Sequence, residues 1–118
     1  MLFRSLQDMK KDGPQPLLLY SYGSYGSTSD PYFSSTRLSL LDRGVIYALT
    51  NVRGSQIYGR RSYEEGKMLN KKNTFYDFID AGKFLVSQGY TDPDQLMCSG
   101  GSAGYLYKIG RASCRERV

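Results

Sequence analysis

Residues 96–104 read Leu-Met-Cys-Ser-Gly-Gly-Ser-Ala-Gly and place Ser102 between two glycines, directly after a short apolar segment. Gly-x-Ser-x-Gly at the end of a strand is typical of a nucleophile elbow, a sharp strand-to-helix turn that exposes the serine hydroxyl. Glycines stand on both sides because larger side chains would collide at this strained turn. The N–H groups that follow the serine can then donate to an oxyanion. Ser102 is therefore the candidate nucleophile, with an ordinary turn or a phosphate-binding loop as the alternative.

The segments before this motif alternate between strand patterns and helix patterns. Apolar runs predict strands at residues 17–20, 45–52 and 96–98. The near-continuous apolar character of 45–52 indicates burial on both faces. Apolar spacing predicts a short helix over residues 33–42 and a longer helix before the last strand. This order predicts an α/β protein with a parallel sheet and right-handed crossovers.

The longer helix has recognisable ends in the sequence. Thr74 is expected to cap its N-terminus, and Asp77, three residues later, is favourable to the helix dipole. Gly89 is expected to end the helix. Apolar residues at helical spacing predict one buried face, formed by Phe75, Phe78, Ile79, Gly82, Leu85 and Val86.

Several reactive residue types near the motif have plain structural interpretations. Asp77 and Asp80 are carboxylates of a catalytic type, but their place on the helix predicts capping and solvation. Lys71 and Lys72 are expected to form a solvated face before the helix. Cys98 is expected to be a small strand residue rather than a reactive thiol.

Residues 21–29, Ser-Tyr-Gly-Ser-Tyr-Gly-Ser-Thr-Ser, directly follow the first predicted strand. This Tyr/Gly/Ser stretch is compatible with a low-complexity flexible segment or with a structured loop. Enzymes with a nucleophile elbow take a second oxyanion donor from the loop after an earlier strand. Residues 22–24 lie in the right order along the chain to supply that donor.

The composition restricts the chemistry. The 118 residues include no histidine, so the chain by itself cannot complete a Ser-His-Asp triad. Two cysteines provide neither a disulfide framework nor a zinc site, and we expect no metal and no cofactor. The longest apolar run is far too short to span a membrane, so we expect no membrane partner.

Residues 108–118, Lys-Ile-Gly-Arg-Ala-Ser-Cys-Arg-Glu-Arg-Val, match the translation of a common sequencing-library adapter. We expect them to be a non-native tail. Four basic residues and one acidic residue in this tail account for +3 of the net charge of +5, so +2 remains for residues 1–107. The charge therefore predicts no binding to nucleic acid. A native basic tail that binds nucleic acid or an acidic surface is the alternative.

Segments along most of the chain carry a more specific resemblance. From Asp77 to Gly104 the sequence follows the pattern D-x3-A-x3-hydrophobic-x14-G-x-S-x-G. Residues 20–26 read Tyr-Ser-Tyr-Gly-Ser-Tyr-Gly and resemble the segment Y-G-Y-G-S-Y-G, with Ser21 replacing a glycine. Further matches lie at residues 37–44, 52–54, 63–67 and 71–75. From residue 16 to residue 104 the chain thus resembles the catalytic domain of the prolyl oligopeptidase family of serine peptidases, most closely its oligopeptidase B branch.

The resemblance implies a partial α/β-hydrolase fold, a parallel-sheet core with a nucleophile elbow. It makes residues 1–107 the N-terminal part of a catalytic domain, truncated so that the acid and the histidine of the triad lie downstream. It implies that Ser102 is the nucleophile. The phenol hydroxyl of Tyr22 and the backbone N–H of Ala103 would donate to the oxyanion, and Tyr25 would lie near the substrate pocket.

By the same resemblance the function is that of a serine oligopeptidase that hydrolyses short peptides, in the oligopeptidase B branch after Arg or Lys. A β-propeller domain is expected in cis, and the location is expected to be cytoplasmic, with the periplasm as the alternative. The alternatives are another α/β-hydrolase (a prolyl-specific peptidase, a dipeptidyl peptidase or an esterase) and a non-catalytic binding fragment. The chain alone is expected to be inactive and to fold poorly, because a sheet without its later strands exposes an edge.

Two departures from the family pattern bear on local geometry. Tyr105 stands where the family has a second glycine after the elbow, and residues 53–56 contain fewer glycines than the glycine-rich family segment. Tyr22 and Tyr25 also have a packing interpretation, since tyrosines are often half-buried for their area alone.

Overall fold

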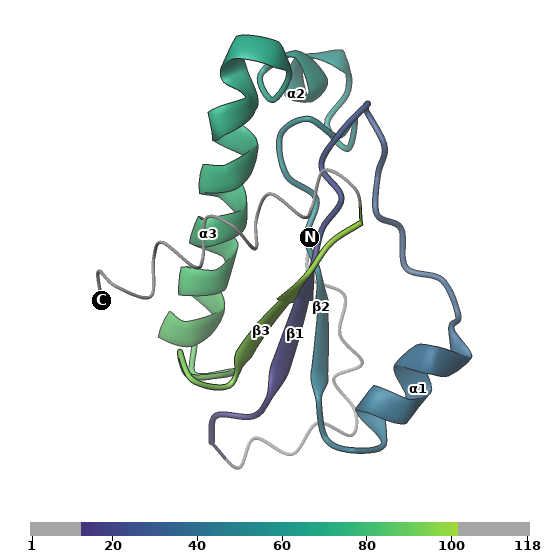
Figure 1. The fold of residues 1–118 in the computed structure, drawn as a ribbon, viewed down its shortest axis with the longest axis vertical. Helices are drawn as coiled ribbons and strands as arrows, with labels where there is room; N and C mark the ends of the chain where they lie inside the picture. The colour runs from purple at the N-terminus through teal and green to yellow at the C-terminus, as the bar shows by residue number, and fades with distance from the viewer. Residues whose placement is uncertain (1–12, 102–118) are drawn as a thin grey trace.

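The computed structural model describes residues 13–101, which form a three-stranded parallel sheet flanked by helices (Figure 1). The strands are β1 (Leu17–Tyr20), β2 (Ile46–Leu49) and β3 (Leu96–Ser99), in the order β2-β1-β3. Because all three strands are parallel, their carboxyl ends lie at one edge of the sheet. The predicted α/β architecture with a parallel sheet is confirmed.

Four helical segments connect the strands: α1 (Ser35–Leu41), α2 (Arg60–Glu64), the 3₁₀ turn η1 (Met68–Asn70) and α3 (Lys71–Ser87). Figure 1 shows α1 and α3 on opposite sides of the sheet. The predicted helix at residues 33–42 is confirmed as α1, which buries none of its own residues. Neither α2 nor η1 was predicted, because each is shorter than two turns and too short to show a clear apolar period.

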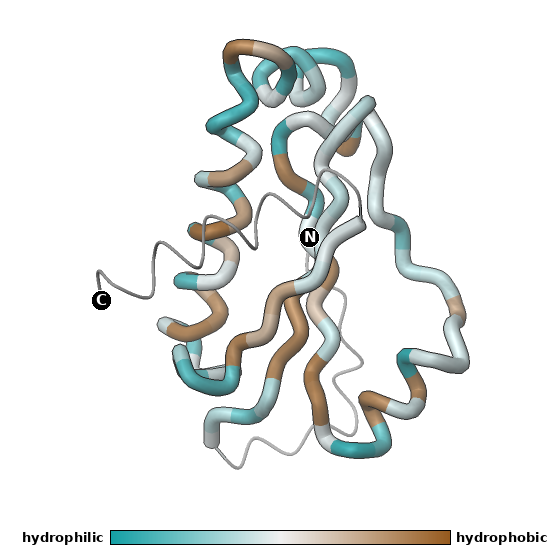
Figure 2. The backbone as a smooth tube through the Cα atoms, in the orientation of Figure 1, coloured by the Kyte–Doolittle hydropathy of each residue, from teal (hydrophilic) through white to brown (hydrophobic). Residues whose placement is uncertain are grey.

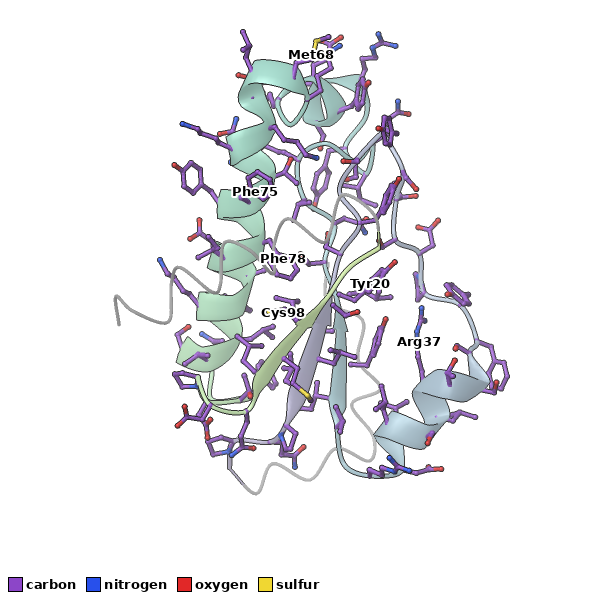
Figure 3. All side chains as sticks on the ribbon, in the orientation of Figure 1. Tyr20, Arg37, Met68, Phe75, Phe78 and Cys98 are labelled. Atoms are coloured by element: carbon purple, nitrogen blue, oxygen red, sulfur yellow. The ribbon has the colours of Figure 1, made fainter. Side chains whose placement is uncertain are left out.

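The core lies between the sheet and α3. Leu17 and Leu19 of β1 are fully buried and belong to one hydrophobic cluster with Phe78 and Leu85 of α3. Figure 2 shows the strands as largely hydrophobic, and Figure 3 shows Phe78 projecting from α3 toward the sheet. Complete burial of a leucine or phenylalanine side chain contributes about 1.5–3 kcal/mol. This cluster therefore fixes α3 against the sheet.

The buried face of α3 is narrower than its apolar pattern predicts. Gly82 is buried, and a Cβ atom there would lie 3.3 Å from Cδ2 of Leu96, so the glycine permits close packing of the helix on the sheet. Phe78, Gly82 and Leu85 are confirmed as buried. Ile79 is 38% exposed, and its predicted burial is wrong because it lies about 100° around the helix from Phe78.

Strand β2 differs from its prediction in length and in burial. The expected strand covered residues 45–52, but the paired part stops at Leu49, because its partner β1 ends at Tyr20. Ala48 and Leu49 are buried, whereas the first two residues of β2 are only half-buried. Because consecutive strand residues point to opposite faces, burial on both faces is confirmed for the carboxyl half of β2 and is incomplete in its first two residues.

The predicted N-terminus of α3 is also wrong. The helix begins at Lys71, directly after η1, and not after a cap at Thr74. Thr74 lies in the first turn, where its buried hydroxyl donates to the carbonyl oxygen of Arg53 at 2.6 Å and lies 3.1 Å from that of Gly66. Carbonyls from two loops, rather than the first N–H groups of the helix, therefore satisfy this hydroxyl.

The predicted C-terminus of α3 is confirmed. Gly89 has a φ of +75°, a left-handed conformation that glycine adopts without penalty. Its N–H donates to the carbonyl oxygen of Val86 at 3.0 Å, and the N–H of Tyr90 donates to that of Leu85 at 3.1 Å. These two bonds form a Schellman motif, which ends the helix and turns the chain toward β3.

Several predictions fall outside the described residues. They concern Ser102, Ala103, Tyr105 and the tail at 108–118. Over residues 13–101 no helix has the length and apolar character needed to cross a membrane. In the same range no group of metal-binding side chains is assembled.

Candidate active site

Two strand ends meet at the carboxyl edge of the sheet, close to the predicted elbow. Tyr20 at the end of β1 is paired with Ser99 at the end of β3, and the N–H of the next residue, Ser21, donates to the Ser99 carbonyl oxygen at 3.3 Å. A Cβ atom placed on Gly101 would lie 4.0 Å from Cδ2 of Tyr22. The ring of Tyr22 therefore lies beside the residue that immediately precedes the predicted nucleophile.

Two of the four predicted site residues are described. Ser102 and Ala103 follow the last described residue, so their roles stay predictions. Tyr22 is half-buried beside the approach to the elbow, whereas Tyr25 is 84% exposed. The large exposed area of Tyr25 leaves its ring available for contact with a ligand or with another part of a larger protein.

Residues 22–26, which we call the Tyr22 loop, are a structured loop and not a flexible low-complexity segment. Three of its residues have left-handed backbone, with φ of +64° at Gly23, +53° at Tyr25 and +68° at Gly26. The N–H of Gly26 donates to the carbonyl oxygen of Gly54 at 3.0 Å, and the N–H of Gln56 donates back to that of Gly26 at 3.2 Å. The loop is thus paired with the segment that follows β2.

Lys71 contacts the Tyr22 loop from the first turn of α3. Its ammonium donates to the carbonyl oxygen of Gly23 at 2.7 Å and to Oγ of Ser24 at 2.6 Å. Burial lowers the pKa of Lys71 below its usual value. The prediction of a solvated lysine is therefore wrong for Lys71, because the helix starts a turn earlier than expected, and is confirmed for the exposed Lys72.

Asp77 joins α3 to the loop after β2. It accepts hydrogen bonds from Arg53 Nη2 at 2.6 Å, from Arg53 Nε at 2.9 Å and from the backbone N–H of Arg53 at 2.9 Å. The hydrogen bond with Asp77 raises the pKa of the Arg53 guanidinium. Neither the helix dipole nor solvent is the partner of Asp77, so its predicted role is wrong, whereas Asp80 is exposed as expected.

Three polar residues of α3 thus contact the loops beside the candidate site, at positions three residues apart: Lys71, Thr74 and Asp77. Sequence reasoning missed this row. Residues three apart on a helix are neighbours on its surface, so the spacing was a usable signal. It was overlooked because the apolar face of the same helix gave the stronger pattern.

A pocket lies next to Tyr22, on the side of the sheet that carries α1. Its lining includes Tyr20, Tyr22, Tyr25 and Arg37. The Arg37 guanidinium lies 4.2 Å from the ring centre of Tyr32 and 4.7 Å from that of Tyr47, and Figure 3 shows the side chain extending from α1. Cation–π contact with two rings orients this cation.

Comparison with known proteins identifies the class to which this arrangement belongs. Residues 31–108, more than half of the chain, match the prolyl oligopeptidase family, peptidase family S9. The chain therefore belongs to the prolyl oligopeptidase family, and the described residues form part of its α/β-hydrolase fold.

Individual relatives indicate which branch of the family the chain resembles. It is 54% identical over 100 residues to dipeptidyl aminopeptidase BI of Pseudoxanthomonas mexicana and 52% identical over 101 residues to Protease 2 of Moraxella lacunata. These alignments cover 85% and 86% of this chain but 14% and 15% of the relatives. The structure of oligopeptidase B from Leishmania major matches with a TM-score of 0.81 and 50% identity, over 86% of this chain and 14% of that one. The resemblance to the oligopeptidase B branch is confirmed.

Proposed function

We propose that this chain supplies the nucleophile and the tyrosine oxyanion donor of a serine oligopeptidase. The observation that carries the proposal is the position of the Tyr22 ring beside Gly101, at the meeting point of β1 and β3. Ser102 would attack the scissile carbonyl, and negative charge would develop on the carbonyl oxygen. The phenol hydroxyl of Tyr22 and the N–H of Ala103 would donate to that oxygen. One such donor is worth roughly 10²–10³ in kcat.

Proton transfer in this mechanism needs a base that the chain does not contain. A histidine would accept the proton of Ser102 and pass it to the leaving amine, while a carboxylate orients the imidazole. The 118 residues hold no histidine, so this base would come from outside them. The chain alone is therefore proposed to be inactive, although it carries the groups that bond to the substrate carbonyl.

We propose short peptides as substrates, cleaved after Arg or Lys. Support comes from the relatives, which are named Protease 2 and oligopeptidase B. The proposal includes a β-propeller domain in cis that limits the size of the peptide. A second candidate function is removal of dipeptides, because the 54% identical relative is named a dipeptidyl aminopeptidase. A peptide with a blocked N-terminus separates the two, since only the first activity cleaves it internally.

The test uses a chimera in which residues 16–104 of this chain replace the aligned segment of Protease 2 from Moraxella lacunata. We expect the chimera to unfold cooperatively and to hydrolyse an N-terminally blocked arginyl fluorogenic peptide. Ser102→Ala should lower kcat by about 10⁵-fold or more. Tyr22→Phe should lower kcat by about 100-fold with little change in KM. Tyr76→Phe, at a 57% exposed tyrosine of α3, is the matched control.

Three results would contradict the proposal. A chimera that does not unfold cooperatively would show that this chain is not a compatible part of the catalytic domain. Full activity of the Ser102→Ala chimera would exclude that serine as nucleophile. A Tyr22→Phe chimera with the same kcat as the Tyr76→Phe chimera would exclude Tyr22 from the oxyanion site.

A further inference from the structure

Lys71 is far from Tyr22 in sequence, yet its side chain reaches the loop that carries Tyr22. The ammonium bonds to the carbonyl oxygen of Gly23, the residue after Tyr22, and to the hydroxyl of Ser24. The two distances, 2.7 and 2.6 Å, are those of close, charge-assisted hydrogen bonds. Hydrogen bonds from a charged donor are about twice as strong as neutral ones.

The hydrogen-bond partners of the Lys71 ammonium are neutral groups, the carbonyl oxygen of Gly23 and the hydroxyl of Ser24. Among residues 13–101 the ion pairs of the other basic side chains use Glu64, Glu65 or Asp77, and Lys71 takes part in none of them. Its ammonium is instead half-buried against a neutral carbonyl and a neutral hydroxyl. Removing a cation from water without a carboxylate partner costs free energy. Among residues 13–101, the hydrogen bonds to the Tyr22 loop offset this cost.

The Tyr22 loop needs such contacts because of its backbone. Glycine has more conformational freedom than any other residue, and Gly23 and Gly26 both lie in the left-handed region. Tyr25 shares that region, where a non-glycine residue is strained. The pairing of Gly26 with Gly54 holds one end of the loop, and Lys71 holds the end next to Tyr22.

We propose that Lys71 is a positioning residue for the oxyanion site: its ammonium, bonded to Gly23 and Ser24, holds the Tyr22 loop in the conformation that places the Tyr22 hydroxyl beside the elbow. The inference rests on the function proposed above. Stabilisation of the transition state depends on preorganised donors, and a misplacement of about 1 Å costs about 100-fold in rate. Loss of Lys71 therefore acts on kcat through Tyr22 and leaves substrate binding largely intact.

The experiment uses the same chimera with Lys71→Met, and Lys72→Met as the matched control. Both variants lose one positive charge from the first turn of α3, but the side chain of Lys72 is exposed. We expect Lys71→Met to lower kcat by about 10-fold or more while KM changes by less than about two-fold. Lys72→Met should leave both constants within about two-fold of the parent.

A double-mutant cycle with Tyr22→Phe separates positioning from general stability. If Lys71 acts through the Tyr22 hydroxyl, Lys71→Met should change kcat by less than about two-fold once that hydroxyl is gone. Equal losses with and without the Tyr22 hydroxyl would overturn the inference, as would a Lys71→Met variant that behaves like Lys72→Met. A peptidyl arginine aldehyde, which forms an oxyanion on Ser102, should bind more weakly to Lys71→Met in proportion to the loss of kcat/KM.

Folding is checked by the thermal unfolding midpoint of each variant. If Lys71→Met is unfolded at the assay temperature, Ser24→Ala replaces it in the cycle, because this change removes one of the two acceptors and leaves the charge. The inference then requires that the effects of Ser24→Ala and Tyr22→Phe on kcat are non-additive in the same way. A Tyr22→Phe chimera with normal kcat contradicts the proposed function, whereas a slow Tyr22→Phe chimera with an inert Lys71 contradicts only this inference.

Discussion

The ion pair between Arg53 and Asp77 gives the sharpest prediction for stability. Asp77→Ala removes the acceptor for three donor atoms of Arg53, Nε and Nη2 of the guanidinium and the backbone nitrogen. Fully exposed ion pairs contribute about 0–1 kcal/mol. This pair is partly shielded, with side chains 38% and 26% exposed, and a hydrogen bond to a charged group contributes about 1.5–3 kcal/mol. After allowance for solvent screening we expect Asp77→Ala to lower the free energy of unfolding by about 2 kcal/mol.

The matched control for this prediction is Asp80→Ala. Asp80 lies one turn further along α3, has the same charge and is exposed. We expect Asp80→Ala to change stability by less than about 0.5 kcal/mol. Urea titration of the chimera, read by pulse proteolysis, measures both variants against the parent. Equal stability of Asp77→Ala and Asp80→Ala would refute the reasoning, because it would mean that the short contacts to Arg53 add nothing to what any exposed aspartate provides.

The remaining predictions concern Ser21, which follows β1, and Tyr47 of β2. The hydroxyl of Ser21 is fully buried and has no hydrogen-bond partner among the described residues, so we expect Ser21→Ala to stabilise the chimera by about 1 kcal/mol. The control Ser27→Ala, at an exposed position, should change stability little. A loss of stability in Ser21→Ala, measured by urea titration, would count against this prediction. Burial raises the pKa of Tyr47 above its usual value, with Arg37 opposing the shift. The folded form therefore resists deprotonation, and the stability that the neutral phenol provides is lost as the pH rises above about 10. Tyr47→Phe should reduce the fall in unfolding midpoint between about pH 9 and about pH 11, and an unchanged fall would contradict the prediction.

The order of elements was predictable from the sequence, because it depends on strong local signals. Residues 17–20 are a short apolar run, and the segment before Gly89 is a helix with an apolar face and a glycine end. Both signals come from burial and from backbone freedom, which act within a few residues. The start of α3 was not predictable in the same way. Thr74 has the residue type of a cap, but distant carbonyls from Arg53 and Gly66 decide where its hydroxyl lies.

The candidate site was predictable only in part, for the same physical reason. The order of the strands pointed to the loop at residues 22–24, and the resemblance to the prolyl oligopeptidase family pointed to Tyr22 within it. The role of Lys71 depends on a contact across 48 positions of the chain. Residue type gave the wrong answer there, since most lysines are solvated. Such a contact becomes visible only when the fold brings α3 and the Tyr22 loop together.

Residues 53–56, after β2, contain fewer glycines than the family segment, and they show how the loop arrangement tolerates this difference. Gly54 has a φ of +103°, and a Cβ atom there would lie 2.6 Å from the carbonyl oxygen of Gly23, so glycine is required at that position. Ser55, the next residue, is buried, and its hydroxyl donates to the carbonyl oxygen of Val52 at 2.8 Å. A serine is therefore tolerated next to the essential glycine, because it satisfies its own polar atom. The sequence at residues 53–56 therefore keeps both the close approach of Gly54 to Gly23 and the pairing of Gly54 with Gly26, on which the position of Tyr22 depends.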